Sequence, residues 1–394
     1  MKGPGIWKEQ KEERGNRMRQ LSAEEKKWVE ETLKKIREKM IVVVNRNRGI
    51  IPYTTVDGHF DDKSKEDPCW WTNGFWGGIM WQLYVLTGSE MFRQEAIGVE
   101  EKLDFNLMNS RGLDHDNGFK WLPTSVVRYK RERNKESLNR ALLAANNMAG
   151  RFNIAGNFIR AWNNWDDVDR RGFAIIDCMM NLPLLYWASE ETTDPRFRLI
   201  AMAHADVARQ TFVREDGSVN HIVVFDPFTG DVLGSLGGQG YGEGSSWTRG
   251  QSWGIYGFAL SYHYTGEKRF LDTSKKIADY VLSAIPENYL VPIDYRQPKD
   301  VDLEDSTAAA ITASGLIELA TQLPDDADKY LDAALKLLMT LDEKRCSWSM
   351  DTDNILNNCA VDYHGDGHNM SIIYGDYYFI EAVMSLAGKA LRIF

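Results

Sequence analysis

A pair of helical segments recurs six times along the chain, and this recurrence constrains the fold more than any other feature. Segments such as "SAEEKKWVEETLKKIREKM" carry one apolar stripe and a charged face, whereas segments such as "DSTAAAITASGLIELATQL" are almost uncharged. The first kind packs with one face toward solvent, and the second kind is buried on all sides. Apolar periodicity predicts these helices at residues 22–41, 72–88, 89–108, 117–130, 135–152, 174–192, 194–212, 246–266, 267–285, 305–323, 327–346 and 375–391.

The connections between the predicted helices alternate as well. Each uncharged helix is joined to the next charged one by a short turn, as in "LTGSEMF" and "YTGEKRF", whereas most other connections are longer. Six such hairpins closing on themselves predict an all-α, single-domain (α/α)6 barrel over residues 21–394, after a solvated lead-in at 1–20. The long connections then meet at one rim, at the N-terminal ends of the inner helices, where a pocket is expected.

Composition narrows the possible partners and the expected compartment. The formal charge of −10 argues against nucleic acid or an anionic membrane surface as a partner. The cysteines are scattered without a CxxC motif, which suits a reducing compartment. The polar start of the chain does not resemble a signal peptide, and no apolar stretch is long enough to span a membrane. We therefore expect a cytoplasmic protein, and the sequence does not indicate its oligomeric state.

Acidic, imidazole, indole and guanidinium side chains are concentrated at the predicted rim. Asp177 is the one charge in the apolar run "GFAIIDCMMNLPLLYWA", and Asp116 lies in "DHDNGF". Glycosidic chemistry generally uses a pair of carboxyl groups, aromatic planes suit the faces of sugar rings, and an arginine offers a planar fork to a carboxylate. The other rim residues of interest are Trp71, His115, Trp162, His221, Gln239, Trp247, Arg249 and Trp253.

Several of these residues also have a purely structural explanation. Asp177 suits a helix cap or a core carboxylate that accepts backbone amides, and Trp253 suits a core position on an inner helix. Arg249 suits an ion pair with Asp116 or Glu243. We expect that pair to be exposed, so that replacing Arg249 changes stability little. The convergence of all these residues on one rim favours a binding pocket.

The sequence contains no recognisable motif for a metal site, a nucleotide-binding loop or a nucleophilic serine. The histidines show no HxxxH or HExxH spacing, and "DTDN" lacks the rest of a calcium loop. The glycine-rich "GSLGGQGYGEGSS" has no Gly-Lys-Ser/Thr ending, and no serine lies in a nucleophile elbow. Neither a metal nor a cofactor is expected.

Several motifs, in order from about residue 70 to 391, resemble those of the unsaturated glucuronyl hydrolases, glycoside hydrolase family 88. They are "WWTNGFWGGIMWQLY", "HDNGF", "IIDCMMNLPLLYWA", "HIVVFDP", "GSSWTRGQSWGIYGFAL", "DSTAAAITASGLIELA" and "YGDYYFIEA". The resemblance implies an (α/α)6 barrel, with Asp177 as general acid/base and Asp116 as the second essential carboxylate. It also implies that Trp71, His115, Trp162, His221, Gln239, Arg249 and Trp253 line the subsite for an unsaturated uronate, where we also expect Trp247.

The resemblance further implies a reaction on fragments that polysaccharide lyases produce. Such a fragment ends in a uronate with a C4=C5 double bond, which is protonated at C4 and hydrated at C5. An aspartate whose pKa is raised by desolvation can hold the required proton near neutral pH. This chemistry accounts for a carboxyl group in the apolar surroundings of Asp177.

Two departures from the family pattern leave the substrate open. Asn117 replaces the usual apolar residue after Asp116, and "HGDGHNMSII" lacks the Ser and Lys pattern of members that prefer sulfated chondroitin fragments. Hydrolysis of unsaturated rhamnogalacturonan or ulvan fragments is one alternative. A sugar 2-epimerase-like isomerase is less favoured, because it would need facing histidines. A binding module without catalysis is disfavoured by the presence of both aspartates.

Overall fold

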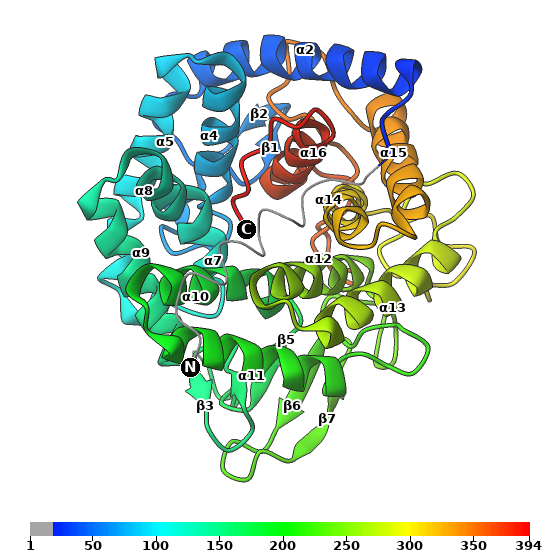
Figure 1. Cartoon of the computed structure of the whole chain (residues 1–394). Coiled ribbons are helices and arrows are strands. Elements are labelled where there is room, and N and C mark those ends of the chain that lie inside the picture. Colours follow the sequence, from blue (N-terminus) through cyan, green and yellow to red (C-terminus); the bar gives the residue numbers. More distant parts are fainter. Residues whose placement is uncertain (1–18, 165) are drawn as a thin grey trace.

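The computed structural model describes residues 19–164 and 166–394, and helices dominate it (Figure 1). The helices that are buried on nearly all sides are α4 (Phe75–Thr87), α7 (Asn117–Trp121), α10 (Cys178–Thr192), α12 (Thr248–Thr265), α14 (Ser306–Gln322) and α16 (Ile373–Leu386). A π-helical turn, η2 (Leu122–Val126), and α8 (Val127–Glu132) continue α7. The amphipathic helices are α2 (Ala23–Arg46), α5 (Glu90–Lys102), α9 (Lys135–Ala149), α11 (Pro195–Thr211), α13 (Lys268–Ala284) and α15 (Ala327–Lys344).

Contacts between the buried helices follow their order in the chain. Starting from α4, they run through η2 and α7 to α10, then to α12, α14 and α16, and α16 packs back against α4. The amphipathic helices lie outside: α5 packs on α4, α9 on α7 and α10, α11 on α10, α13 on α12, and α15 on α14. The long helix α2 contacts α16 and α4. The predicted alternation of buried and amphipathic helices is therefore confirmed.

Several of the buried helices end at a residue with a left-handed backbone conformation, which allows a short turn to the next helix. Gly88 ends α4 with φ 69°, and Gly266 ends α12 with φ 73°. Glycine adopts this conformation without a steric penalty, and its N–H bonds back to the last helical turn. Each of these glycines belongs to the repeated "TG" turn, which sends the chain directly into the next amphipathic helix.

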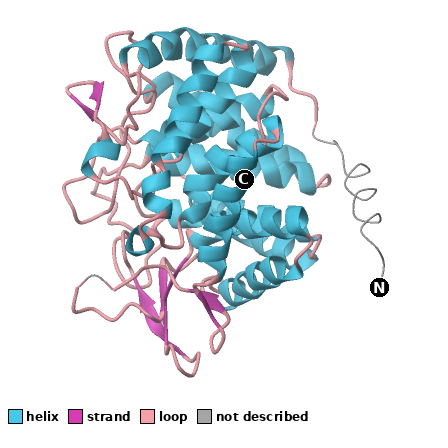
Figure 2. Cartoon of the chain, turned by 90° about the vertical axis from the view of Figure 1, so that its left-hand side faces the viewer, coloured by secondary structure: helices cyan, strands magenta, loops and turns pink. Residues whose placement is uncertain are grey.

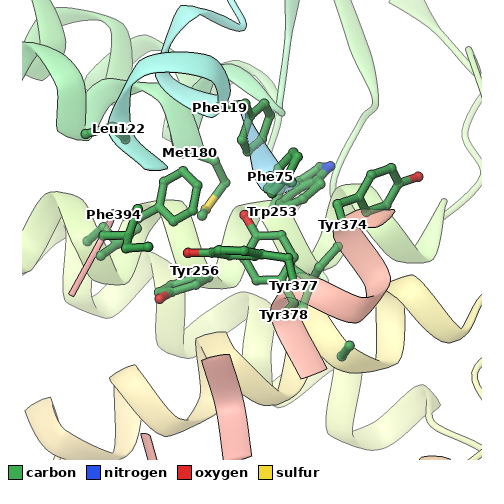
Figure 3. Packing of buried hydrophobic residues seen from close by; sticks show 14 of the residues in the cluster. Phe75, Phe119, Leu122, Met180, Trp253, Tyr256, Tyr374, Tyr377, Tyr378 and Phe394 are labelled. Carbon is green, nitrogen blue, oxygen red and sulfur yellow. The ribbon is translucent and has the colours of Figure 1, made fainter. Parts of the chain in front are cut away.

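Aromatic rings from different helices fill the centre of the molecule (Figure 3). Phe119 lies 5.3 Å from Phe75 and 5.2 Å from Trp253 between ring centroids, and Tyr378 lies 5.5 Å from Trp253. The ring of Phe394 stacks on Tyr378 at 6.0 Å. A core of large rings favours one packing arrangement, because each ring must find an edge or a face to contact.

Three small antiparallel sheets lie on the side that carries most of the long loops (Figure 2). The largest joins β5 (Phe173–Ile175), β6 (Ile222–Phe225) and β7 (Val232–Leu236), and the short hairpins are β1 (Thr55–Val56) with β2 (His59–Phe60) and β3 (Phe152–Asn153) with β4 (Phe158–Ile159). The predicted helix at 174–192 is wrong over its first residues, because β5 pairs with the β-branched strand β6 and α10 begins only at Cys178.

The remaining boundaries differ modestly from the predictions. The predicted helix 89–108 is divided into α5 and the short α6 (Asp104–Leu107), and 117–130 contains the π-helical turn. The short elements α3 (Lys63–Glu66) and η1 (Ser110–Gly112) fall in long connections. The predicted lead-in at 1–20 lies outside the described residues as far as residue 18. Within the described residues, no helix is both long and apolar enough to cross a bilayer.

Candidate active site

Asp177 occupies the junction between β5 and α10, directly before the first helical residue. Its side chain is 15% exposed, and its Oδ1 atom is buried without a hydrogen-bond partner among the described residues. Burial raises the pKa of this carboxyl group to about 7, although the positive charge of Arg249 acts in the opposite direction. The aspartate is therefore partly protonated near neutral pH, as the sequence predicted.

The three-stranded sheet brings His221 to Asp177. Ile175 pairs with Ile222, and the backbone N–H of Ile176 donates to the carbonyl of His221 at 3.1 Å. This register places Nε2 of His221 3.7 Å from Oδ1 of Asp177. Residues that are distant in sequence meet here because β5 ends beside the start of β6.

A backbone contact from the turn after β7 determines the tautomer of His221. The N–H of Gln239 donates to its Nδ1 at 3.0 Å, so Nδ1 is an acceptor and the proton is on Nε2. Burial and the charge of Arg249 lower the pKa of His221 to about 3. The imidazole is therefore neutral at physiological pH, with its one N–H on the side of Asp177.

Asp116 directly precedes α7, and its side chain is 11% exposed. Its Oδ2 lies 3.4 Å from Nε2 of His115, whose pKa is lowered to about 4 by burial. Burial, Asp114 and Asp177 all raise the pKa of Asp116 well above its usual value. The negative charge of Asp177 thus disfavours ionisation of Asp116, so the two carboxyl groups titrate as a coupled pair.

Asn181, which the sequence analysis did not select, links the two aspartates. Its side-chain Nδ2 donates to Oδ1 of Asp116 and to the backbone carbonyl of Asp177, both at 3.2 Å. The sequence could have indicated Asn181, because it is the next polar residue after Asp177 in the apolar run and lies one helical turn later, on the same helix face.

Arg249 is buried, which corrects the expectation of an exposed rim residue. Only 2% of its side chain is exposed, and it forms an ion pair with Asp305, which is fully buried. It also donates to the carbonyls of Ala360 at 2.7 Å and Val361 at 2.6 Å. Its partner is therefore neither Asp116 nor Glu243, and the expectation of an exposed ion pair, on which the predicted small stability change rests, is wrong.

Trp247 connects this arginine to the histidine. Its ring lies 4.1 Å from the His221 ring and 4.4 Å from the Arg249 guanidinium carbon. The side chain of Gln239 donates to the carbonyl of Val361 at 2.9 Å, so Gln239 and Arg249 hold the same loop. This loop, residues 360–363, closes one side of the cluster.

The other three predicted tryptophans pack against aromatic or apolar side chains. Trp71 lies 5.4 Å from Phe119 and 5.1 Å from Tyr374. Trp253 is fully buried, and its indole N–H is near enough to Asp177 to lower the pKa of that carboxyl group. Trp162 packs on Ile175 and Ile222, the paired residues next to Asp177 and His221. Direct contacts, or contacts through one intervening residue, thus connect the ten predicted residues.

The arrangement suits proton transfer in largely dry, aromatic surroundings. It supplies carboxyl groups with raised pKa values, a neutral imidazole donor and aromatic faces. Among the described residues, no group of three or more His, Cys, Asp or Glu side chains is placed to hold a metal ion. A separate cavity of about 220 Å³, lined by residues such as Tyr256, His263 and Glu381, lies toward the C-terminal ends of α12, α14 and α16.

Known proteins with similar sequences and structures indicate the family of this chain. No family model matches the chain. The unsaturated glucuronyl hydrolase of Bacillus sp. (strain GL1) is 38% identical over 327 residues, which cover 80% of this chain and 86% of the relative. The crystal structure of unsaturated glucuronyl hydrolase from Bacillus sp. GL1, described as responsible for the degradation of glycosaminoglycan, superposes with a TM-score of 0.85 at 32% identity, covering 91% of this chain and 96% of the other.

A second similar structure contains a bound sugar. It is a mutant unsaturated glucuronyl hydrolase from Streptococcus agalactiae complexed with dGlcA-GalNAc6S, with a TM-score of 0.76 and 27% identity, covering 94% of each chain. The sequence identity to the Bacillus relative, and the share of both chains that it covers, are high enough to show membership of the same family. The chain therefore belongs to the unsaturated glucuronyl hydrolase family.

Proposed function

We propose that this protein is a glycoside hydrolase that releases the terminal 4,5-unsaturated uronic acid from lyase-generated oligosaccharides, in particular disaccharides of the glycosaminoglycan type. The observation that carries the proposal is the Asp177 carboxyl group, whose pKa is about 7 and which faces a neutral imidazole and lies beside Asp116. The complex of the Streptococcus relative with dGlcA-GalNAc6S supports a substrate of this class.

We infer that the helical hairpins form a single-domain (α/α)6 barrel over residues 21–394. The closed succession of contacts from α4 to α16 and back supports this inference, as do the amphipathic helices outside it. The described cysteines are all free, which is consistent with the proposed cytoplasmic location.

In the first step, protonated Asp177 gives its proton to C4 of the unsaturated uronate. The π electrons of the C4=C5 bond form the new C–H bond, and positive charge develops at C5 and on the ring oxygen. Partial burial keeps the proton available near pH 7 and leaves a carboxylate that can stabilise the new charge.

In the second step, water adds at C5 and gives its proton to the Asp177 carboxylate. The resulting hemiketal opens, so that the bond between C5 and the ring oxygen breaks and a ketone forms at C5. C1 then carries a hydroxyl group and the leaving sugar, and collapse of this hemiacetal releases the sugar as an alcohol. One residue therefore acts first as an acid and then as a base.

The remaining predicted residues have binding roles in this proposal. Asp116 accepts hydrogen bonds from ring hydroxyls and polarises Asp177. The N–H of His221 at Nε2 orients the Asp177 carboxyl group or a substrate hydroxyl, and Trp71, Trp162 and Trp253 provide apolar faces. Arg249 supplies positive charge near the substrate carboxylate, while its hydrogen bonds hold residues 360 and 361.

A panel of lyase-generated disaccharides tests the proposal. The near-ultraviolet absorbance of the conjugated double bond should disappear as the sugar is released, while a saturated β-glucuronide should remain intact. Asp177→Asn should lose about 10²–10⁴-fold in rate, the range that general acid catalysis supplies. Release of sugar from the saturated glucuronide would overturn the proposed mechanism, and turnover of rhamnogalacturonan or ulvan fragments alone would overturn the proposed substrate class.

A further inference from the structure

Asn181 makes three hydrogen bonds that meet at the junction of α7 and α10. Besides its two donations to Asp116 and Asp177, its Oδ1 accepts the backbone N–H of Phe119 at 2.8 Å. The side chain is fully buried, so water cannot replace these partners without cost. One amide therefore ties the first turn of α7 to the first turn of α10.

The backbone of α7 is adapted to this contact. A Cβ atom at Gly118 would lie 2.5 Å from Cα of Asn181 and 2.6 Å from its Oδ1. Only a glycine at position 118 lets the two helices approach closely enough for the amide to reach Asp116. The close approach and the hydrogen bonds are independent observations at the same junction.

We propose that Asn181 is a positioning residue that holds the Asp116 carboxyl group in a fixed orientation toward Asp177. This inference rests on the proposed function, in which the two aspartates carry the reaction. Because the Nδ2 group of Asn181 donates a hydrogen bond to Asp116 and cannot accept one, it favours the charged form of that carboxyl group. The other donation of Asn181 goes to the backbone carbonyl of Asp177, so the amide acts directly on the carboxyl group of Asp116 alone.

Other charged groups act on the same pair and must be held constant in a test. Asp114, Lys120 and Arg151 act around Asp116, and His115 contacts it. Arg249 and His221 lie on the side of Asp177. The Cys178 thiol interacts electrostatically with both aspartates, and burial raises its pKa well above the usual value. Variants of Asn181 retain all of these residues, so their identities are the same in every protein that is compared.

Asn181→Asp is the most informative variant, because it keeps the size of the side chain and the acceptor for Phe119. The ionised form of the new carboxyl group has no proton to donate to Asp116, whereas the protonated form has one. We expect kcat/KM to fall about 10- to 100-fold at pH 8, the effect of one hydrogen bond to a charged group, and to fall less at pH 5. Asn106→Asp is the control, because Asn106 is equally buried but donates to the carbonyl of Gly112.

A titration without substrate separates this inference from the proposed function. The carboxyl carbon of Asp116, followed by ¹³C NMR and assigned with Asp116→Asn, should titrate at higher pH in Asn181→Ala and Asn181→Asp than in the wild type. An unchanged titration, with variant and wild-type rates in the same ratio at every pH, would overturn the role of Asn181. Failure of the wild type to hydrolyse any unsaturated disaccharide would instead overturn the proposed function, and the titration would still decide the role of Asn181.

Discussion

Asp177 shows how one buried carboxyl group couples stability to function. Its pKa rises from 3.8 to about 7 because folding removes most of its contact with water. A raised pKa in the folded state means that folding is favoured at low pH and that this contribution is lost as pH rises through about 7. The burial that keeps this proton available for the proposed chemistry therefore lowers the stability of the folded protein at neutral pH, where the carboxyl group begins to ionise.

Asp177→Asn should stabilise the protein in a pH-dependent way. An amide carries no charge, so the variant avoids the cost of ionising a buried group, which is about 4 kcal/mol once the pH exceeds 7. Melting temperatures at pH 4.5 and pH 8 should show the variant close to the wild type at the lower pH and several degrees higher at the upper one. A melting-temperature difference that does not change with pH would show that Asp177 does not titrate in this range.

Arg249 is the residue whose environment differs most from its prediction. Arg249→Ala leaves the buried Asp305 without its partner, which should destabilise the protein by about 3–5 kcal/mol. Adding Asp305→Asn removes the unpaired charge and should restore part of the melting temperature. If Arg249 also serves the substrate carboxylate, KM should remain high in the double variant, and Arg249→Lys should recover only part of the affinity. A double variant with a wild-type KM would assign Arg249 to structure alone.

At the scale of elements, the sheet β5–β6–β7 brings together candidate site residues that the helices alone would not bring together. Asp177 follows β5, His221 precedes β6, and Gln239 follows β7. The turn that carries Gln239 passes over the imidazole, and Gly238 adopts a left-handed conformation there with φ 57°. The orientation of His221 therefore depends on the backbone of a neighbouring turn.

Gly238→Ala tests this dependence. A Cβ atom at this position would lie 2.0 Å from Nδ1 of His221, so the imidazole or the turn must move, and the left-handed backbone adds strain. We expect kcat/KM to fall at least about tenfold, with only a small loss of melting temperature. Gly242→Ala in the same loop has no atom within 4 Å of the added methyl group and should behave like the wild type. Equal activities of the two variants would show that the backbone of this turn does not determine the orientation of His221.

At the scale of the whole molecule, the aromatic centre joins the site to the opposite end of the buried helices. Phe394 is 4% exposed and contacts rings on α4, α7 and α16, among them Phe119, which contacts Trp253. Two of the candidate site residues, Trp71 and Trp253, pack against Phe119 in this centre. We therefore expect the aromatic centre to stabilise the positions of these residues and to take no part in the chemistry.

Phe394→Ala should destabilise the protein far more than it slows the reaction. Loss of a buried ring costs about 3–5 kcal/mol, because the cavity left behind only partly collapses. Phe228→Ala is a suitable control, since that ring is 76% exposed. Chemical denaturation should show the difference, and kcat at a temperature where both variants are folded should remain within a few-fold of the wild type. A variant as stable as the wild type would mean that the tail does not pack into the centre.

The sequence by itself was sufficient to predict the alternating buried and amphipathic helices, because apolar periodicity and glycine turns are local properties. It also indicated the residues of the site, because a lone Asp in an apolar run and indoles before buried helices are visible without coordinates. The start of α10 was misplaced, because "FAII" has helix-compatible residues and becomes a strand only when it pairs with 222–225.

The tertiary structure alone decided how those site residues act. Arg249 finds Asp305 across 56 positions in the sequence and Val361 across 112, and Asn181 reaches Asp116 across 65. The pKa of Asp177 depends on removal of water by segments from several helices and a sheet. Burial and partnership between distant segments arise only when the whole chain has packed, so no local pattern specifies them.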